Sequence, residues 1–277
     1  MLLKHPNPSM NQDLKSRIPA AIAYVLIIGI ATLMSPISTM VLLYAFALLS
    51  LFEFVKSSMG NQNGALIYIM GLFIAILALP FLGLGISKLI LYVVYVSVLL
   101  FAINIGFIIF NKKTFFTGRP VIIMALIYIV LPFLIASFMT LTYEDFPRII
   151  LGTFVIVWLN DAGAYFSGKA FGKTKLSPSI SPNKTWEGLI GGGILGVLIC
   201  IAIAELIGGL SLSHWMILSV VVWITGSMGD LVESSWKRQL GLKDSGSLMG
   251  GHGGFLDRLD SFIYAIPFVS LYYIIIQ

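Results

Sequence analysis

The chain has 277 residues, of which 58% are hydrophobic and only 10% are charged, with a net charge of +5 and a mean hydropathy of +0.98. Soluble globular domains carry about a quarter charged residues. The composition therefore excludes a soluble domain and predicts an all-α, polytopic integral membrane protein. The positive charge requires no nucleic acid, because cations beside membrane spans set orientation and contact membrane lipid.

Apolar runs that could cross a hydrocarbon core of ~30 Å recur along the chain. About nine transmembrane helices of this length are expected, near residues 18–34, 37–55, 65–84, 89–110, 120–141, 149–168, 188–208, 213–231 and 260–276. A signal peptide is the alternative for the first run. The Met34-Ser35-Pro36 junction lacks a small-x-small cleavage pattern, so we expect this segment to remain in the mature chain.

Lysine and arginine residues are distributed unevenly over the connections between these runs. With the N-terminus inside, fifteen of the 17 lie on the cytoplasmic side and only Lys88 and Arg148 on the other. Cytoplasmic connections carry the excess of Lys and Arg in membrane proteins. We therefore expect a multi-pass protein of the cell membrane whose N-terminus and active site are cytoplasmic.

Acidic residues divide the chain into two unlike parts. Only four precede residue 160, in connections or near the ends of spans, whereas eight lie between residues 161 and 260. We interpret residues 1–140 as a transmembrane scaffold and candidate dimerisation region. Residues 148–277 are interpreted as the catalytic transmembrane region.

Asp161 is the first carboxylate of the second part and falls inside the sixth expected span. An ionised carboxylate within a membrane helix costs about 2.5–3.5 kcal/mol, so we expect it to face a partner or a wet cavity. Next come four lysines between residues 169 and 187, where Pro178 and Pro182 predict a loop. Lys184 ends this loop and is a candidate substrate-binding residue. Gly188, Gly192 and Gly196 follow, a spacing typical of closely packed membrane helices.

The polar segment 234–261 lies between the last two spans. Its 28 residues hold seven charged side chains and six glycines. Asp230 and Glu233 precede this segment and are three residues apart, as are Asp257 and Asp260 within it, so each pair is expected to share a helix face. Clustered carboxylates repel one another unless a cation neutralises them, and a hard ion such as Mg²⁺ prefers oxygen ligands.

The polar segment resembles the C-terminal signature of the phosphatidate cytidylyltransferase family, also called CDP-diacylglycerol synthases. Twelve positions match at the family's spacing: Ser234, Lys237, Arg238, Lys243, Asp244, Gly246, His252, Gly253, Gly254, Asp257, Arg258 and Asp260. Segments that begin at Asp161, Phe171 and Ser181 are also similar to family segments. Trp236 and Gly250 depart from the family's usual residues, and neither departure removes a charge.

The resemblance implies that CTP reacts with phosphatidate of the inner leaflet to give CDP-diacylglycerol and pyrophosphate, and that the protein is a homodimer. We expect direct in-line attack without a covalent enzyme intermediate. The expected catalytic residues are Asp230, Asp257, Asp260, Lys237, Arg238, Lys243, His252 and Arg258. The expected substrate-binding residues are Lys184, Ser234, Asp244, Gly253 and Gly254. Mg²⁺, alone or with a second cation, is assigned to Asp161, Asp230, Asp257 and Asp260, with Asp244 as the alternative ligand.

Two other functional classes use similar residues. A cation-coupled transporter would place broken helices near the membrane midplane in repeated halves, whereas the polar residues here gather at the ends of spans in one half of the chain. A CTP-dependent lipid-alcohol kinase is a closer alternative. Such a kinase releases CDP, whereas a cytidylyltransferase releases pyrophosphate.

Overall fold

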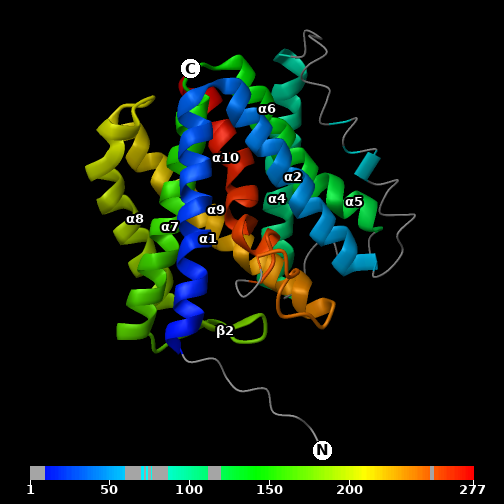
Figure 1. Ribbon diagram of the computed structural model, residues 1–277, viewed down its shortest axis with the longest axis vertical. Helices are drawn as coiled ribbons and strands as arrows, with labels where there is room; N and C mark the ends of the chain where they lie inside the picture. Colours follow the sequence, from blue (N-terminus) through cyan, green and yellow to red (C-terminus); the bar gives the residue numbers. More distant parts are fainter. Residues whose placement is uncertain are drawn as a thin grey trace, which may run out of the picture.

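The computed structural model describes residues 10–59, 87–111, 120–249 and 253–277, together with residues 70, 71, 73 and 76. Within these ranges the chain forms a bundle of helices and one two-stranded sheet (Figure 1). The predicted all-α class is therefore confirmed. The helices are α1 (Met10–Met34), α2 (Pro36–Met59), α4 (Ser87–Asn111), α5 (Val121–Ala125), a π-helical turn η2 (Leu126–Val130), α6 (Leu131–Thr142), α7 (Phe146–Phe171), α8 (Trp186–Ile207), α9 (Leu212–Gln239), the 3-10 turn η4 (Leu256–Arg258) and α10 (Asp260–Ile276).

Six helical segments of the described chain are long and apolar enough to cross a membrane, and shorter apolar helices cover Ala21–Met34 and Asp260–Ile276. The segments correspond to eight of the expected spans. The remaining one, at 65–84, falls almost entirely outside the described residues, so the count of nine stays a prediction. The span at 121–142 contains the π-helical turn directly before Pro132, where the proline has no N–H to donate.

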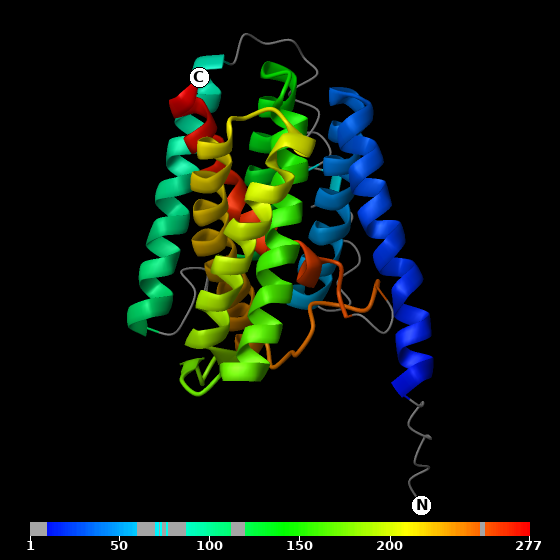
Figure 2. The same ribbon diagram turned by 90° about the vertical axis from the view of Figure 1, so that its left-hand side faces the viewer.

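Helix α10 lies at the centre of the bundle (Figure 2). It is buried along most of its length, and it packs against α9, α6 and α4. The rings of Phe262 on α10 and Phe154 on α7 stack with centroids 3.9 Å apart. A helix that is apolar on all sides is stable only when other helices surround it or lipid does, and here the other helices surround it.

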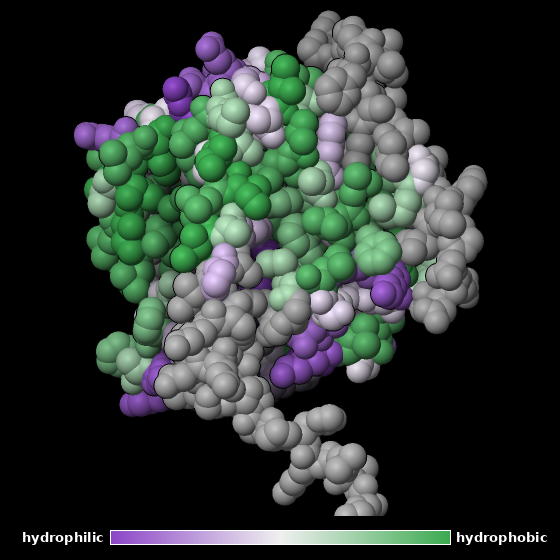
Figure 3. All heavy atoms as spheres, in the orientation of Figure 1, coloured by the Kyte–Doolittle hydropathy of each residue, from purple (hydrophilic) through white to green (hydrophobic). Residues whose placement is uncertain are grey.

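The face of the bundle seen in Figure 3 has a hydrophobic middle with polar residues toward its two ends. Helix α8 contributes exposed Ile190, Ile194 and Leu198, and α4 contributes exposed Leu99 and Phe107. These side chains have the position expected for contact with acyl chains. The N-terminal end of α1 and strand β2 lie at one end of the bundle, and the C-terminus lies at the other.

Helices α7 and α8 pack closely along the glycine stripe, as the spacing of the glycines predicts. A Cβ atom added at Gly192 would lie 2.5 Å from the carbonyl oxygen of Asn160, and one at Gly196 would overlap the Oδ1 atom of Asn160. The bare backbone therefore allows this approach. It brings the loop before α8 against the end of α7.

That loop is an antiparallel hairpin of β1 (Lys175–Ser177) and β2 (Ser181–Thr185). The structure confirms the predicted loop between two helices, here α7 and α8, but the prolines of this segment did not predict the two strands. Pro182 is tolerated because a two-stranded sheet has only edge strands. At the end of β2, Thr185 begins α8 as its N-cap, since its side chain accepts a hydrogen bond of 3.1 Å from the N–H of Gly188.

Candidate active site

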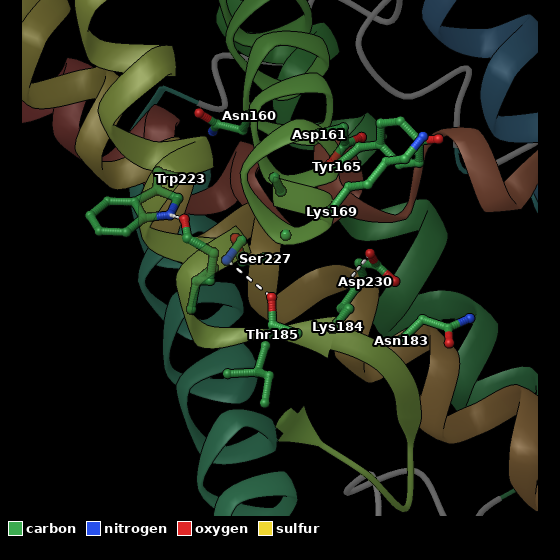
Figure 4. Close-up of a pocket in the computed structure, with 15 residues that line it drawn as sticks. Asn160, Asp161, Tyr165, Lys169, Asn183, Lys184, Thr185, Trp223, Ser227 and Asp230 are labelled. Carbon is green, nitrogen blue, oxygen red and sulfur yellow. Dashed lines mark hydrogen bonds and ion pairs between the residues drawn. The ribbon is translucent and has the colours of Figure 1, made fainter. Parts of the chain in front are cut away.

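A pocket of about 600 Å³ opens between α7, strand β2, α8 and α9 (Figure 4). Three of its lining residues are predicted site residues: Asp161 on α7, Lys184 on β2 and Asp230 on α9. The aromatic side chains of Tyr165 and Trp223 also line it. Residues that are 69 positions apart in sequence thus share one cavity, at the end of the bundle where the hairpin lies.

The Lys184 ammonium forms an ion pair with the Asp230 carboxylate inside this pocket. Ser234, one helical turn further along α9, donates a hydrogen bond of 3.2 Å to the other oxygen of Asp230. The two charged side chains are 30% and 29% exposed. A soluble anion can therefore reach both of them. We call Asp161, Lys184, Asp230 and Ser234 the pocket cluster.

Asp161 has no hydrogen-bond or ion-pair partner within the described chain, and it faces the pocket. Its carboxylate interacts electrostatically with Asp230 and with the cations Lys184 and Arg258. Asp260, at the start of α10, is buried and interacts with both Asp161 and Asp230. The N–H of Ser261 donates to Asp260 Oδ1 at 2.6 Å. Two of the four expected metal ligands, Asp161 and Asp230, thus line the pocket, and Asp260 lies within electrostatic reach of both.

Lys237 belongs to a second group of charges, deeper between the helices. Its Nζ atom lies 2.8 Å from Glu233 Oε2 and 2.6 Å from Asp257 Oδ1. Lys237 is 8% exposed and Glu233 is 1% exposed. We call Glu233, Lys237 and Asp257 the buried cluster.

Asp257 accepts hydrogen bonds from the backbone as well as from Lys237. The N–H of Ser245 lies 3.1 Å from both carboxylate oxygens, and the N–H of Gly254 lies 2.7 Å from Oδ2. Burial raises the pKa of Asp257, but the hydrogen bonds from Lys237 and from the backbone N–H of Gly254 more than offset it and hold this pKa below its ordinary value. These donors therefore favour the charged form of Asp257. Its contacts fix the polar segment, and its assignment as a metal ligand stays a prediction.

Each of the two acidic pairs, Asp230 with Glu233 and Asp257 with Asp260, was expected to share a helix face, and the structure shows a different arrangement. Asp257 lies in η4 and Asp260 begins α10, so the two do not belong to one helix. Asp230 and Glu233 do share α9, but Asp230 pairs with Lys184 across the pocket whereas Glu233 pairs with Lys237. The helix is interrupted at Leu259, which has φ −118° and ψ −7° and separates Asp257 from Asp260.

The remaining predicted residues have varied surroundings. Arg238 donates to two backbone oxygens, of Leu242 at 2.8 Å and of Ile180 in the hairpin at 3.4 Å. It thereby ties the hairpin to α9. Lys243, Asp244 and Arg258 are exposed, and Gly253 adopts φ +83° beside Asp244 and Asp257. His252 lies outside the described residues.

Sequence reasoning missed Glu53, near the end of α2 in the part interpreted as scaffold. It is 2% exposed, and it accepts hydrogen bonds from the polar segment. Its presence as the only carboxylate inside the second expected span was a signal for this contact, because a buried carboxylate requires donors. The scaffold region therefore contacts the site directly.

The donors around the pocket suit a hard cation in chemical type. Asp161, Asp230 and Asp260 supply carboxylate oxygens, and Asp161 faces the pocket without a partner among the described residues. Among the described residues, no group of three or more His, Cys, Asp or Glu side chains is arranged to hold a metal ion. Mg²⁺ commonly keeps water and substrate phosphates as ligands beside one or two carboxylates, so an incomplete protein shell is compatible with it.

The amino-acid sequence of the chain is similar to those of one protein family. The profile of the "Cytidylyltransferase family" matches residues 15–276. A phosphatidate cytidylyltransferase of Haemophilus influenzae is 46% identical over 130 residues, which cover 45% of each chain. One from Staphylococcus haemolyticus is 39% identical over 172 residues, which cover 61% of this chain and 65% of the relative. The chain thus spans about half to two thirds of the length of these curated relatives.

Proposed function

Because the chain belongs to the cytidylyltransferase family, we propose that it transfers the cytidylyl group of CTP to phosphatidate, giving CDP-diacylglycerol and pyrophosphate. The observation that carries this proposal is the pocket cluster, where Asp161, Lys184 and Asp230 line a cavity between membrane helices. One substrate is a soluble polyanion and the other is a lipid phosphate. A charged pocket between the end of a helical bundle and its apolar flank suits both.

The proposed step is direct in-line displacement. A phosphatidate oxygen forms a bond to the α-phosphorus of CTP while the bond from that phosphorus to the β-phosphate bridging oxygen breaks, so pyrophosphate leaves with the electron pair. Phosphatidate is already an anion near pH 7, so the step requires positioning and charge neutralisation rather than a strong general base. No covalent enzyme intermediate is needed.

Lys184 supplies the first neutralising charge. In the structure its ammonium is held by Asp230, which pre-orients it within the pocket. Phosphate oxygens that enter the pocket would share or replace Asp230 as its partner. Arg258 and Lys243 are exposed cations and are proposed to neutralise further phosphate oxygens. Lys237 is proposed to act through Asp257, which it contacts at 2.6 Å.

Mg²⁺ is the proposed cofactor, with Asp161, Asp230 and Asp260 as the residues that would hold it and Asp257 as a further predicted ligand. When bound, the ion would neutralise developing charge on the phosphates. Asp161 and Asp230 face the pocket from α7 and α9, so the protein contributes oxygen donors from two helices. A second cation and a homodimer are carried forward as expectations from the family resemblance.

The pocket is proposed to open on the cytoplasmic side of the cell membrane, at the inner leaflet. The described cations Lys169, Lys184 and Lys237 lie near the hairpin end of the bundle, and Arg148 lies at the opposite end, where α7 begins. This separation agrees with the orientation that the positive-inside rule favours. Cysteine labelling from either side of the membrane, at the exposed positions 148 and 173, tests the orientation.

The decisive experiment supplies purified protein with phosphatidate, Mg²⁺ and CTP that carries a radiolabel on the α-phosphate. We expect label in the lipid product and one pyrophosphate released per labelled lipid. A lipid-alcohol kinase would instead leave the α-label in soluble CDP. If folded protein that is supplied with phosphatidate transfers no label to lipid, the proposed reaction is contradicted.

A further inference from the structure

Helix α2 contributes a carboxylate to the polar segment from the opposite part of the chain. Glu53 is 2% exposed and lies about two turns before the end of α2. Three groups of the polar segment donate to it. The Ser245 hydroxyl and the Leu256 N–H lie 3.2 and 2.9 Å from Oε2, and the Leu248 N–H lies 3.2 Å from Oε1. Both oxygens are therefore engaged.

These donors come from two stretches of the polar segment. Ser245 and Leu248 belong to the described stretch that ends at residue 249, and Leu256 belongs to the one that begins at residue 253. One carboxylate thus holds both stretches together. Ser57, one turn further along α2, donates a hydrogen bond to the carbonyl oxygen of Ser245, so α2 holds this segment at two points.

Two glycines of the polar segment have their backbone against the same carboxylate. A Cβ atom at Gly246 would lie 2.5 Å from Glu53 Oε1, and one at Gly254 would lie 2.7 Å from Oε2. Real Cβ atoms do not approach oxygen so closely. Close backbone approach is what glycine permits. At Gly246 the atom in the way is the Glu53 carboxylate, and at Gly254 it is the Ser245 hydroxyl together with that carboxylate.

The segment that Glu53 holds is also the segment that holds Asp257. Ser245 donates its hydroxyl hydrogen to Glu53 and its backbone hydrogen to Asp257. Gly254 lies against Glu53 and donates its N–H to Asp257 at 2.7 Å. Asp257 in turn contacts Lys237 at 2.6 Å. A continuous series of contacts therefore leads from α2 to the buried cluster.

We propose that Glu53 is a positioning residue of the active site, which fixes the polar segment so that Asp257 and Lys237 keep their working geometry. The inference rests on the proposed cytidylyltransferase activity. Glu53 contacts no residue of the pocket cluster, so its effect acts through Ser245 and Gly254 on Asp257. It also gives the N-terminal region a role in the reaction beyond that of a scaffold.

The substitution Glu53→Gln tests this role with little change in size. Glutamine retains one acceptor oxygen and replaces the other with an NH₂ group, which would face N–H or O–H donors. We expect kcat for label transfer from CTP to fall roughly 10- to 100-fold, because small displacements of catalytic groups cost this much. The KM for CTP should change by less than about threefold, since the pocket cluster keeps its contacts.

The matched control is Glu205→Gln, which changes an exposed carboxylate on α8 and should leave kcat and KM at wild-type values. Folding is checked by the thermal unfolding temperature in the same detergent, with kcat expressed per folded protein. Wild-type kcat in folded Glu53→Gln would overturn the proposal. Inactivity of the wild type would instead contradict the proposed function, so the two failures are distinguishable.

A second set of variants keeps the test valid if Glu53→Gln does not fold. Ser245→Ala removes one donor to Glu53 but retains the N–H that Asp257 accepts, and we expect a smaller loss of kcat, of about three- to tenfold. Gly246→Ala adds a Cβ against the Glu53 carboxylate. If Ser245 and Gly246 both act through their contact with Glu53, the loss of kcat in the double variant Ser245→Ala/Gly246→Ala is smaller than the product of the losses in the two single variants. The proposal is contradicted if the two single losses of kcat multiply in the double variant, or if Ser245→Ala keeps the wild-type kcat.

Discussion

The pocket cluster and the buried cluster use the same types of residue in opposite ways. Lys184 and Asp230 are each about 30% exposed, and Ser234 is the only other described side chain that bonds to this pair. Lys237, by contrast, lies between two carboxylates with little exposure, and Asp257 receives three further hydrogen-bond contacts from backbone N–H groups. Charges with open coordination can exchange partners with a substrate. Charges that are largely enclosed keep their partners, so they hold the geometry of the site and stabilise the fold.

The comparison shows that a motif does not assign one role to all of its residues. Asp257 and Asp260 both belong to the family signature, yet one anchors a loop and the other lies within electrostatic reach of the pocket. Activity should therefore respond most to the pocket cluster, and stability most to the buried cluster. Single substitutions in the two clusters and in their surroundings test this division.

Lys237→Met should cause the largest loss of stability. Removing one partner of a buried ion pair leaves the other charge uncompensated, which costs about 3–5 kcal/mol of unfolding free energy. Thermal unfolding in detergent measures the change. The matched control, Lys243→Met, removes an exposed cation of the same segment and should alter stability by less than about 0.5 kcal/mol. Equal stability of the two variants would remove the distinction between the clusters.

Asp230→Asn should instead act on the reaction. It removes the charge that holds Lys184 in the pocket, and we expect kcat for label transfer to fall about 10²- to 10³-fold, as when one preorganised electrostatic group is lost. Because Asp230 is partly exposed, the unfolding temperature should hardly change. Asp145→Asn, at the other end of the bundle, is the control for activity. A loss of stability that accounts for the lost activity would make Asp230 a structural residue.

Gly196→Ala should disturb the wall of the pocket without touching a charge. The added Cβ would overlap Asn160 Oδ1, and overpacking of this kind costs about 1–3 kcal/mol. Gly106→Ala on α4 is the matched control, because nothing lies within 4 Å of a Cβ added there. The unfolding temperatures of the two variants are compared in one detergent. Equal values would mean that α7 and α8 do not require this close contact.

Arg148→Gln should have the smallest effect. Arg148 pairs with Asp145 at 2.6 Å, but the side chains are 52% and 44% exposed. Exposed ion pairs contribute about 0.2–1 kcal/mol, so the unfolding temperature should fall only slightly and label transfer should be unchanged. The change in unfolding temperature for this exposed pair is the reference for the change expected in the buried cluster. A loss as large as that of Lys237→Met would show that exposure does not determine the contribution.

Much of the fold could be predicted from local patterns. Apolar runs gave helices near the expected bounds at eight spans, and the glycine spacing at 188, 192 and 196 correctly indicated a close helix contact. The prediction of an exposed basic loop at 169–187 was incomplete, because two short strands depend on pairing with each other rather than on their own residues. Prolines and serines signalled only the break in the helix.

The candidate site was predictable in composition but not in arrangement. Sequence spacing placed Asp230 beside Glu233 and Asp257 beside Asp260, whereas Asp230 pairs with Lys184 of the hairpin and Asp257 pairs with Lys237 of α9. Lys184 is 46 positions from Asp230, and Glu53 is 192 positions from Ser245. No periodicity reports on pairs so far apart.

Hydropathy and motif spacing are properties of neighbouring residues, so they are enough to indicate that the chain lies in a membrane, which part carries its charge and which family it resembles. Tertiary packing decides which carboxylate faces the pocket, that Asp257 contacts Lys237, and that α2 supports the polar segment. A charge buried among helices takes whichever donors the packing brings to it. That packing depends on surfaces from the whole chain.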